Sequence, residues 1–184
     1  MEAIFLILVG AALFSQSWYV LGIYSEGRTM GVFVGGLGLL SLATIMFAPM
    51  VLTGEGVSPS ADHLAEITVM KSLIIVWALY TIGVAAHGLW DFDERAIGLY
   101  CAFLAAATLV PFLYFAIELE SRYGESVSLG LSGAALALTT LASILFFYMG
   151  FGFNVLRLVA GWALLLGGAV ITTIGLFMIS TVIS

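Results

Sequence analysis

The side chains that could do chemistry in this sequence are few, uncharged and arranged on helical faces. Gln16, the only glutamine, follows three aliphatic residues at spacings of three, four and three, which places all four on one face of a helix: Leu6, Val9, Leu13 and Gln16. An amide in hydrocarbon must find a hydrogen-bond partner, because an unpaired polar group is costly there. Gln16 is therefore expected either to bond a neighbouring helix or to face a solute path, where it could donate and accept.

A second face with the same kind of spacing carries aromatic and polar groups. It comprises Trp77, Tyr80, Val84 and His87. Aromatic residues near helix ends usually belong to an interfacial belt or to packing, but Tyr80 falls in mid-helix and its hydroxyl needs a partner. His87 falls near a helix end and is expected to be a hydrated interface residue.

Enzymatic signals are absent from the pattern. There is no glycine-rich phosphate loop and no cysteine–histidine spacing for a metal, and the lone Cys101 is expected to be a small buried hydrophobe. Asp91, Asp93 and Glu94 form an acidic cluster that is typical of a solvated loop. We expect no enzymatic activity, no cofactor, no metal and no nucleic-acid partner.

The composition indicates that these helical faces belong to membrane-spanning segments. The chain has 184 residues, of which 62% are hydrophobic and 9% charged, and its mean hydropathy is +1.19. Soluble domains carry about 25% charged residues, and a spanning helix needs roughly 20 apolar ones. The sequence predicts a single all-α integral membrane domain, 1–184, with helices at roughly 3–24, 30–53, 67–89, 96–117, 128–150 and 158–183. The longest loop is expected from Gly54 to Glu66.

No Asp, Glu, Lys or Arg falls near the middle of a predicted span. Ionisable groups at that depth are expensive, and where they occur they mark proton relays, ion paths or gating charges. The sequence therefore argues against ion-driven transport and against a charged substrate.

Basic residues predict the orientation. Arg28, Arg95 and Arg157 fall in the first, third and fifth loops, against Lys71 and Arg122 on the other side. By the positive-inside rule the odd loops are cytoplasmic, and both termini lie outside the cell membrane.

Two further features concern helix packing. Gly31 and Gly35 form a small-xxx-small step, which allows close approach of helices within or between protomers. Pro111 is expected to kink the fourth helix, and Thr108, one turn earlier, could bond a carbonyl that the proline leaves free.

Three stretches of the sequence carry a family resemblance. The first is Leu8-Val9-Gly10 through Leu13, Ser15 and Gln16. The second is Met30-Gly31-Val32-Phe33-Val34-Gly35-Gly36-Leu37, and the third runs from Tyr80 through His87-Gly88-Leu89-Trp90-Asp91 to Pro111. Together they resemble the urea/amide channel family, often called AmiS/UreI-type, which includes acid-activated urea channels.

The resemblance implies a twisted bundle of three helix hairpins around its own pore, six protomers in a ring, and contact with membrane lipid. The matching pore positions are Leu6, Val9, Leu13 and Tyr80, with Gln16 in the polar place and Val76 or Trp77 where the family has an aromatic. The family's fifth-helix tryptophans are missing, and the nearest substitutes are Phe146, Phe147 and Tyr148. The expected path is thus lined by Leu6, Val9, Leu13, Gln16, Val76, Trp77, Tyr80, Val84 and Phe147.

These patterns leave two functional hypotheses. The first is passive passage of a small neutral solute, such as urea or a short-chain amide, because an uncharged slot rejects ions through their desolvation cost. The second is a non-transporting accessory or assembly subunit that packs on partner helices, which the glycine-rich second helix and the missing fifth-helix tryptophans fit equally well. Flux in proteoliposomes separates the two. An intramembrane enzyme has no visible nucleophile–base or metal pair to support it.

Overall fold

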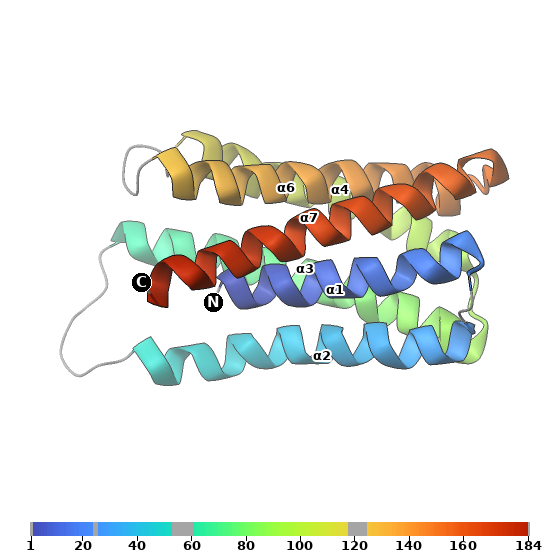
Figure 1. The fold of residues 1–184 in the computed structure, drawn as a ribbon, viewed down its shortest axis with the longest axis horizontal. Helices are drawn as coiled ribbons and strands as arrows, with labels where there is room; N and C mark the ends of the chain where they lie inside the picture. Colours follow the sequence, from blue (N-terminus) through green and yellow to red (C-terminus); the bar gives the residue numbers. More distant parts are fainter. Residues whose placement is uncertain (1, 24–25, 53–60, 118–124, 184) are drawn as a thin grey trace.

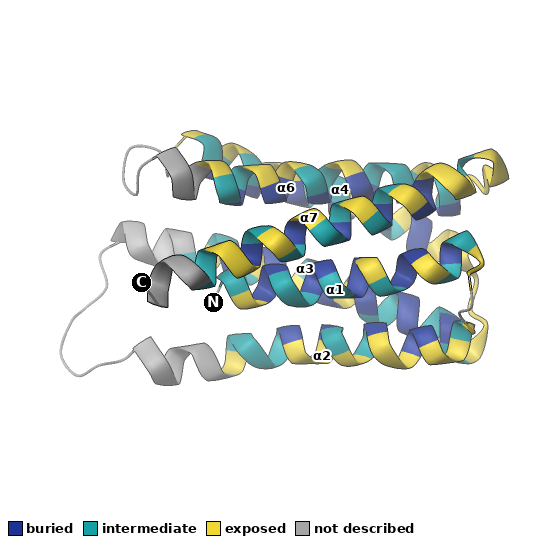
Figure 2. Ribbon diagram, in the orientation of Figure 1, coloured by how far each residue is buried: buried dark blue, intermediate teal, exposed yellow. Residues whose placement is uncertain are grey.

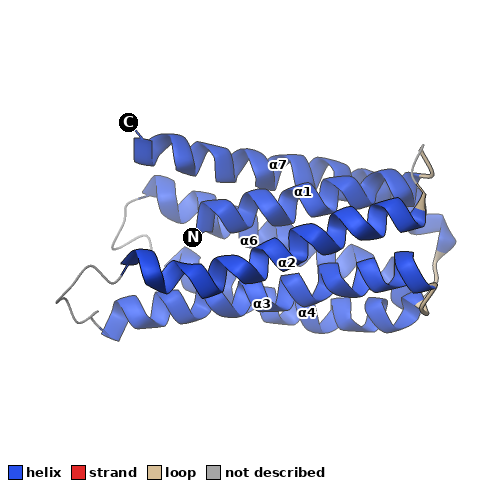
Figure 3. Ribbon diagram, turned by 90° about the horizontal axis from the view of Figure 1, so that it is seen from below, coloured by secondary structure: helices blue, strands red, loops and turns tan. Residues whose placement is uncertain are grey.

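The computed structural model describes residues 2–23, 26–52, 61–117 and 125–183, and every element within them is helical. The elements are α1 (Glu2–Leu21), α2 (Gly27–Leu52), α3 (Ala61–Trp90), α4 (Glu94–Ile117), α6 (Glu125–Leu145), the π-helix η1 (Phe146–Gly150), the 3-10 helix η2 (Asn154–Leu156) and α7 (Arg157–Ile183). Figure 3 shows the helices side by side in one elongated bundle.

Six helical stretches within the described residues are long and apolar enough to cross a membrane. They are Glu2–Leu21, Gly27–Met46, Ile67–Trp90, Glu94–Ile117, Leu129–Gly150 and Asn154–Ile179. The chain is therefore a multi-pass membrane protein, and the predicted number of spans is confirmed. The fifth span combines α6 with η1, and the sixth joins η2 to α7.

One predicted boundary is wrong. The loop expected from Gly54 to Glu66 ends earlier, because α3 already begins at Ala61. Residues 61–66 include two alanines, a leucine and a glutamate, which are good helix formers, so the helix continues past the apolar run that hydropathy detects. The part of that loop over 53–60 lies outside the described residues.

The helices follow one another around the bundle in chain order. Each spanning helix packs on the next along the chain, and α7 returns to pack closely along α1, the most extensive contact between two helices. Figure 1 shows α7 lying beside α1, with the N- and C-terminal ends at the same end of the bundle. Arg28, Arg95 and Arg157 open α2, α4 and α7 at the opposite end. Which end faces the cytoplasm remains a prediction.

The end of α1 is closed by backbone geometry and by an arginine. Gly22 has a φ of 75°, which favours glycine, and the Gly22 and Ile23 amides donate to the carbonyls of Tyr19 and Trp18 at 3.0 Å. This pair of bonds is a Schellman cap. The carbonyl of Val20 would remain unpaired at the helix end, and the Nε of Arg157 donates to it at 2.7 Å. The first residue of α7 is thereby joined to the last turn of α1.

Burial divides each helix into an inner and an outer face (Figure 2). Both faces are apolar, because the outer one must contact lipid while the inner one packs in the core. Every polar residue buried among the described side chains is uncharged; the set is Gln16, Ser17, Ser41, Thr81 and Thr108. The expected absence of charge from the middle of the spans holds for the described interior.

Glycines set the distance between helices. A Cβ on Gly31 of α2 would lie 2.9 Å from the carbonyl oxygen of Ala85 in α3, and one on Gly168 of α7 would lie 2.7 Å from the carbonyl oxygen of Gly10 in α1. The contact atoms are backbone and cannot rotate away. In contrast, a Cβ on Gly36 meets nothing within 4 Å. The glycine step of α2 therefore serves packing inside the protomer.

Gly31→Ala is expected to destabilise the protein by about 1–3 kcal/mol, because its methyl group overpacks a backbone contact. Gly36→Ala is the matched control on the same helix, where the added methyl group finds open space and helix propensity favours alanine by up to about 1 kcal/mol. Denaturation in detergent followed by circular dichroism measures both. Equal stability of the two variants would contradict the assigned packing.

Candidate solute path

Seven of the nine expected path residues come together where α1 packs beside α3. From α1 these are Leu6, Val9, Leu13 and Gln16, and from α3 they are Trp77, Tyr80 and Val84; none is more than 2% exposed. The apolar six belong to one continuous core cluster. The spacings of three and four that defined both faces in the sequence therefore place both inward.

The centre of this cluster is a hydrogen bond between the two helices. The hydroxyl of Tyr80 donates to Oε1 of Gln16 at 2.8 Å. Of the two expectations for Gln16, the interhelical bond is what the structure contains. Because neither partner carries a charge, the bond pairs the Tyr80 hydroxyl with the Gln16 amide oxygen in an apolar interior without the desolvation cost of an ion.

A second buried bond joins α3 to α4, and the sequence analysis missed it. Nε1 of Trp77 donates to Oγ1 of Thr108 at 3.1 Å, while the Thr108 hydroxyl donates to the carbonyl of Leu104 at 2.7 Å. Thr108 was expected to serve a carbonyl freed by Pro111, but that carbonyl belongs to Ala107, four residues before the proline. This contact depends on how α3 and α4 are rotated and shifted relative to each other. A single sequence does not give that relation.

Trp77 and Tyr80 also fix each other. Their rings meet edge to face, with centroids 5.5 Å apart and an interplanar angle of 74°. The indole is anchored at one end by Thr108, and the phenol is anchored at its tip by Gln16. The two aromatic side chains therefore form a rigid wall on α3 that faces α1.

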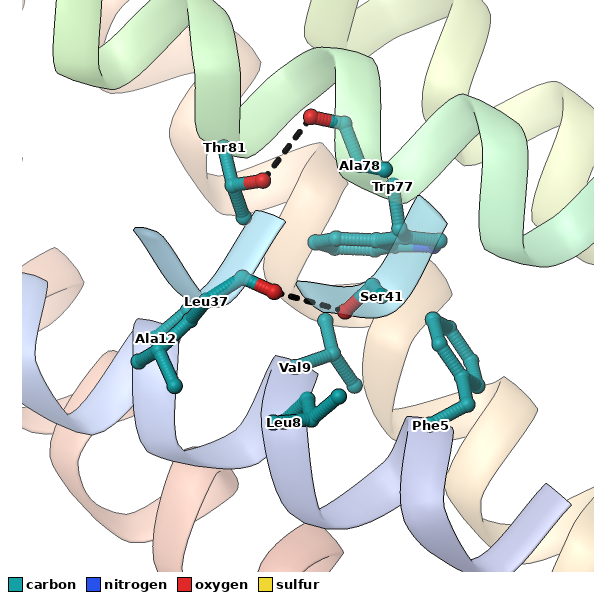
Figure 4. Close-up of a pocket in the computed structure, with 9 residues that line it drawn as sticks. All are labelled: Phe5, Leu8, Val9, Ala12, Leu37, Ser41, Trp77, Ala78 and Thr81. Carbon is teal, nitrogen blue, oxygen red and sulfur yellow. Dashed lines mark hydrogen bonds between the residues drawn. The ribbon is translucent and has the colours of Figure 1, made fainter. Parts of the chain in front are cut away.

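A small void lies beside this wall (Figure 4). It is too narrow to hold a water molecule. The hydroxyls at its edge, Ser41 and Thr81, donate to the carbonyls of Leu37 and Ala78 in their own helices. Its lining comes from α1, α2 and α3: Phe5, Leu8, Val9, Ala12, Leu37, Ser41, Trp77, Ala78 and Thr81.

Two expected path residues lie elsewhere. Val76 is half-buried and lines an open recess of about 180 Å³ between α3 and α4, while its carbonyl accepts a bond from Tyr100. Phe147 is 46% exposed on η1, where its ring packs on Phe146 and Phe151. Phe146 and Tyr148, on the same segment, are the ones that pack against the buried core. A π-helix shifts the register of side chains around the axis, which helical periodicity in a sequence does not reveal.

His87 lies at the end of α3, as its position predicted. It is half-buried, and its Nδ1 is hydrogen-bonded to the carbonyl of Phe92, beyond the helix end. Its backbone carbonyl accepts from Asp91, which has a φ of 54° and ends the helix. His87 is therefore tied to the turn between α3 and α4 and is separate from the Gln16–Tyr80 pair.

In this structure the seven side chains close on one another. A solute that moved between α1 and α3 would have to displace the aliphatic side chains that pack beside Tyr80 and Gln16. Among the described residues, no group of three His, Cys, Asp or Glu side chains could hold a metal ion. The chemistry of the site is therefore hydrogen bonding between neutral groups.

Thr108→Val is expected to lower the stability by about 1–3 kcal/mol, because it leaves the buried indole N–H of Trp77 without an acceptor. Thr140→Val is the control: its hydroxyl also bonds a carbonyl four residues earlier, but the side chain is exposed. Detergent denaturation curves compare the two. A loss no larger than that of the control would show that the Trp77 bond contributes nothing to stability.

Comparison with known proteins gives no match: neither a family model, nor a curated protein, nor a solved structure is similar to this chain.

Proposed function

We propose that this protein is a passive facilitator for a small neutral solute, with urea or a short-chain amide as the preferred class. The observation that carries the proposal is the buried pair of Gln16 and Tyr80, an amide and a phenol joined by a bond of 2.8 Å inside a bundle with no buried charge among its described residues. The resemblance to the urea/amide channel family, drawn from the sequence, points the same way.

The chemistry of the site suits a planar amide. A flat, uncharged molecule can slide past an aromatic wall, and it loses fewer hydrogen bonds with water when an amide and a hydroxyl replace some of them. An ion finds no counter-charge there, so its desolvation cost is not repaid. Leu6, Val9 and Leu13 are the steric filter in this proposal, with Trp77 and Tyr80 opposite them.

Passage requires the closed cluster to open transiently. Leucine and valine side chains can change rotamer without breaking a polar contact. A solute that brings its own donor and acceptor can form hydrogen bonds with Gln16 and Tyr80 in place of those it gives up with water. The same site would stay closed to solutes that cannot form hydrogen bonds of this kind.

The alternative, a non-transporting accessory subunit, loses one of its arguments. The glycine step of α2 was open to use between protomers, but Gly31 and Gly35 lie against Ala85 of α3 within the same chain. The face of α2 that carries Gly31 and Gly35 is thus covered by α3 of the same chain. Assembly into a homo-oligomer, a hexameric ring by the family resemblance, with one path per protomer, is part of the proposal.

Purified protein in liposomes is expected to raise urea and acetamide permeability well above that of empty vesicles, with no conductance for Na⁺ or K⁺. Stopped-flow light scattering measures the solute flux, and electrical recording measures the ions. Background flux for both solutes from correctly folded protein would sink the proposal in favour of the accessory hypothesis.

Val9→Phe is expected to reduce urea flux by about tenfold or more, equivalent to an added barrier of about 1.4 kcal/mol. Val9 is buried beside a void too narrow for water, so the larger ring is also expected to overpack the core by about 1–3 kcal/mol, and flux is compared only in protein that remains folded in detergent. Leu8→Phe is the matched control, since Leu8 lines the same void but is only half-buried and does not lie on the Leu6–Val9–Leu13–Gln16 face. Equal flux in both variants would place the path away from α1.

A further inference from the structure

Only one of the two polar groups of the Gln16 amide takes part in a hydrogen bond among the described residues. Its oxygen accepts from Tyr80, whereas its nitrogen, which carries two N–H donors, has no hydrogen-bond partner within the described residues. Within that same part of the chain, no fully enclosed side-chain nitrogen or oxygen lacks a partner. The Gln16 nitrogen is therefore not fully enclosed, although the residue as a whole is 2% exposed.

The Tyr80 hydroxyl donates a hydrogen bond but accepts none from the described residues. It donates its proton to Gln16, and no donor among the described residues reaches its oxygen, which keeps acceptor capacity. The hydroxyl needs an acceptor, and this need fixes the amide with its oxygen toward Tyr80 and its nitrogen away. A free donor on Gln16 and a free acceptor on Tyr80 are therefore held together by one hydrogen bond.

We propose that this pair recognises the primary-amide edge of a solute, that is, a carbonyl oxygen with an N–H on the same side. The solute carbonyl accepts from the Gln16 nitrogen, and the solute N–H donates to the Tyr80 oxygen. The bond between Tyr80 and Gln16 stays intact and completes a closed ring of three hydrogen bonds. This inference rests on the proposed function and names the chemical feature that the path selects.

The surroundings hold the pair ready for such a ligand. Trp77 packs against the Tyr80 ring and is itself anchored by Thr108, so the phenol has little freedom to turn. A preorganised donor and acceptor lose less entropy on binding than mobile ones. Urea, formamide and acetamide carry the required edge. An amide whose only N–H lies opposite its carbonyl oxygen does not, and neither does a polyol such as glycerol.

Two isomers test the inference. Acetamide and N-methylformamide have the same atoms, but N-methylformamide in its dominant trans form places its N–H opposite the carbonyl oxygen. In proteoliposomes, after subtraction of the flux through empty vesicles, acetamide is expected to permeate about tenfold faster than its isomer, because one net hydrogen bond is lost.

Tyr80→Phe is expected to bring that ratio to within about twofold of one, since it removes the acceptor that distinguishes the isomers. Tyr100→Phe is the matched control: it removes another hydroxyl, which bonds the carbonyl of Val76, and should leave the ratio unchanged. If Tyr80→Phe does not fold, Gln16→Met removes the donor at similar length and should also lower the ratio.

The outcomes separate the two proposals. Absence of protein-dependent flux for urea and both isomers overturns the proposed function, and this inference with it. Flux with a ratio near one in the unmodified protein, or a ratio that survives Tyr80→Phe or Gln16→Met, overturns this inference alone. Urea flux without acetamide flux also counts against it, because the amide edge would then not suffice.

Discussion

The structure depends on the need to pair every polar group in an interior that water does not reach. An unpaired donor or acceptor in hydrocarbon costs several kcal/mol, which is a large part of the net free energy of unfolding of a small domain. Among the described residues, every fully enclosed side-chain polar atom has a partner, and the buried polar groups are neutral. Hydroxyls such as those of Ser41 and Thr81 bond carbonyls of their own helix, while Gln16, Tyr80, Trp77 and Thr108 bond one another across helices.

Helix packing makes these pairs possible. Glycines on α2 and α7 let backbones approach so closely that a single methyl group would collide with a carbonyl oxygen. Because α2 packs on both α1 and α3, it holds these two helices at a fixed rotation and height relative to each other. A side chain as long as glutamine can then reach a tyrosine on the other helix. The polar centre is thus a consequence of small residues elsewhere.

The same pairing that stabilises the bundle gives the proposed path its selectivity. In the proposed path a solute gives up hydrogen bonds with water and needs equivalent ones from Gln16 and Tyr80. Solutes with both a donor and an acceptor can form them, whereas ions and hydrocarbons cannot. Stability and discrimination among solutes then arise from one arrangement, with Gln16 and Tyr80 at its centre.

The sequence by itself determined the number of spans, the neutrality of the described interior and the inward faces of α1 and α3, because hydropathy and helical period are local properties of the chain. It left open whether Gln16 bonds a neighbouring helix, assigned Thr108 to the wrong carbonyl, and grouped Phe147 with residues from which the π-helix separates it. Those matters were decided by tertiary structure, since the partner of a side chain depends on the rotation and height of two helices relative to each other. Several contacts set that relation at once, and no single segment encodes it.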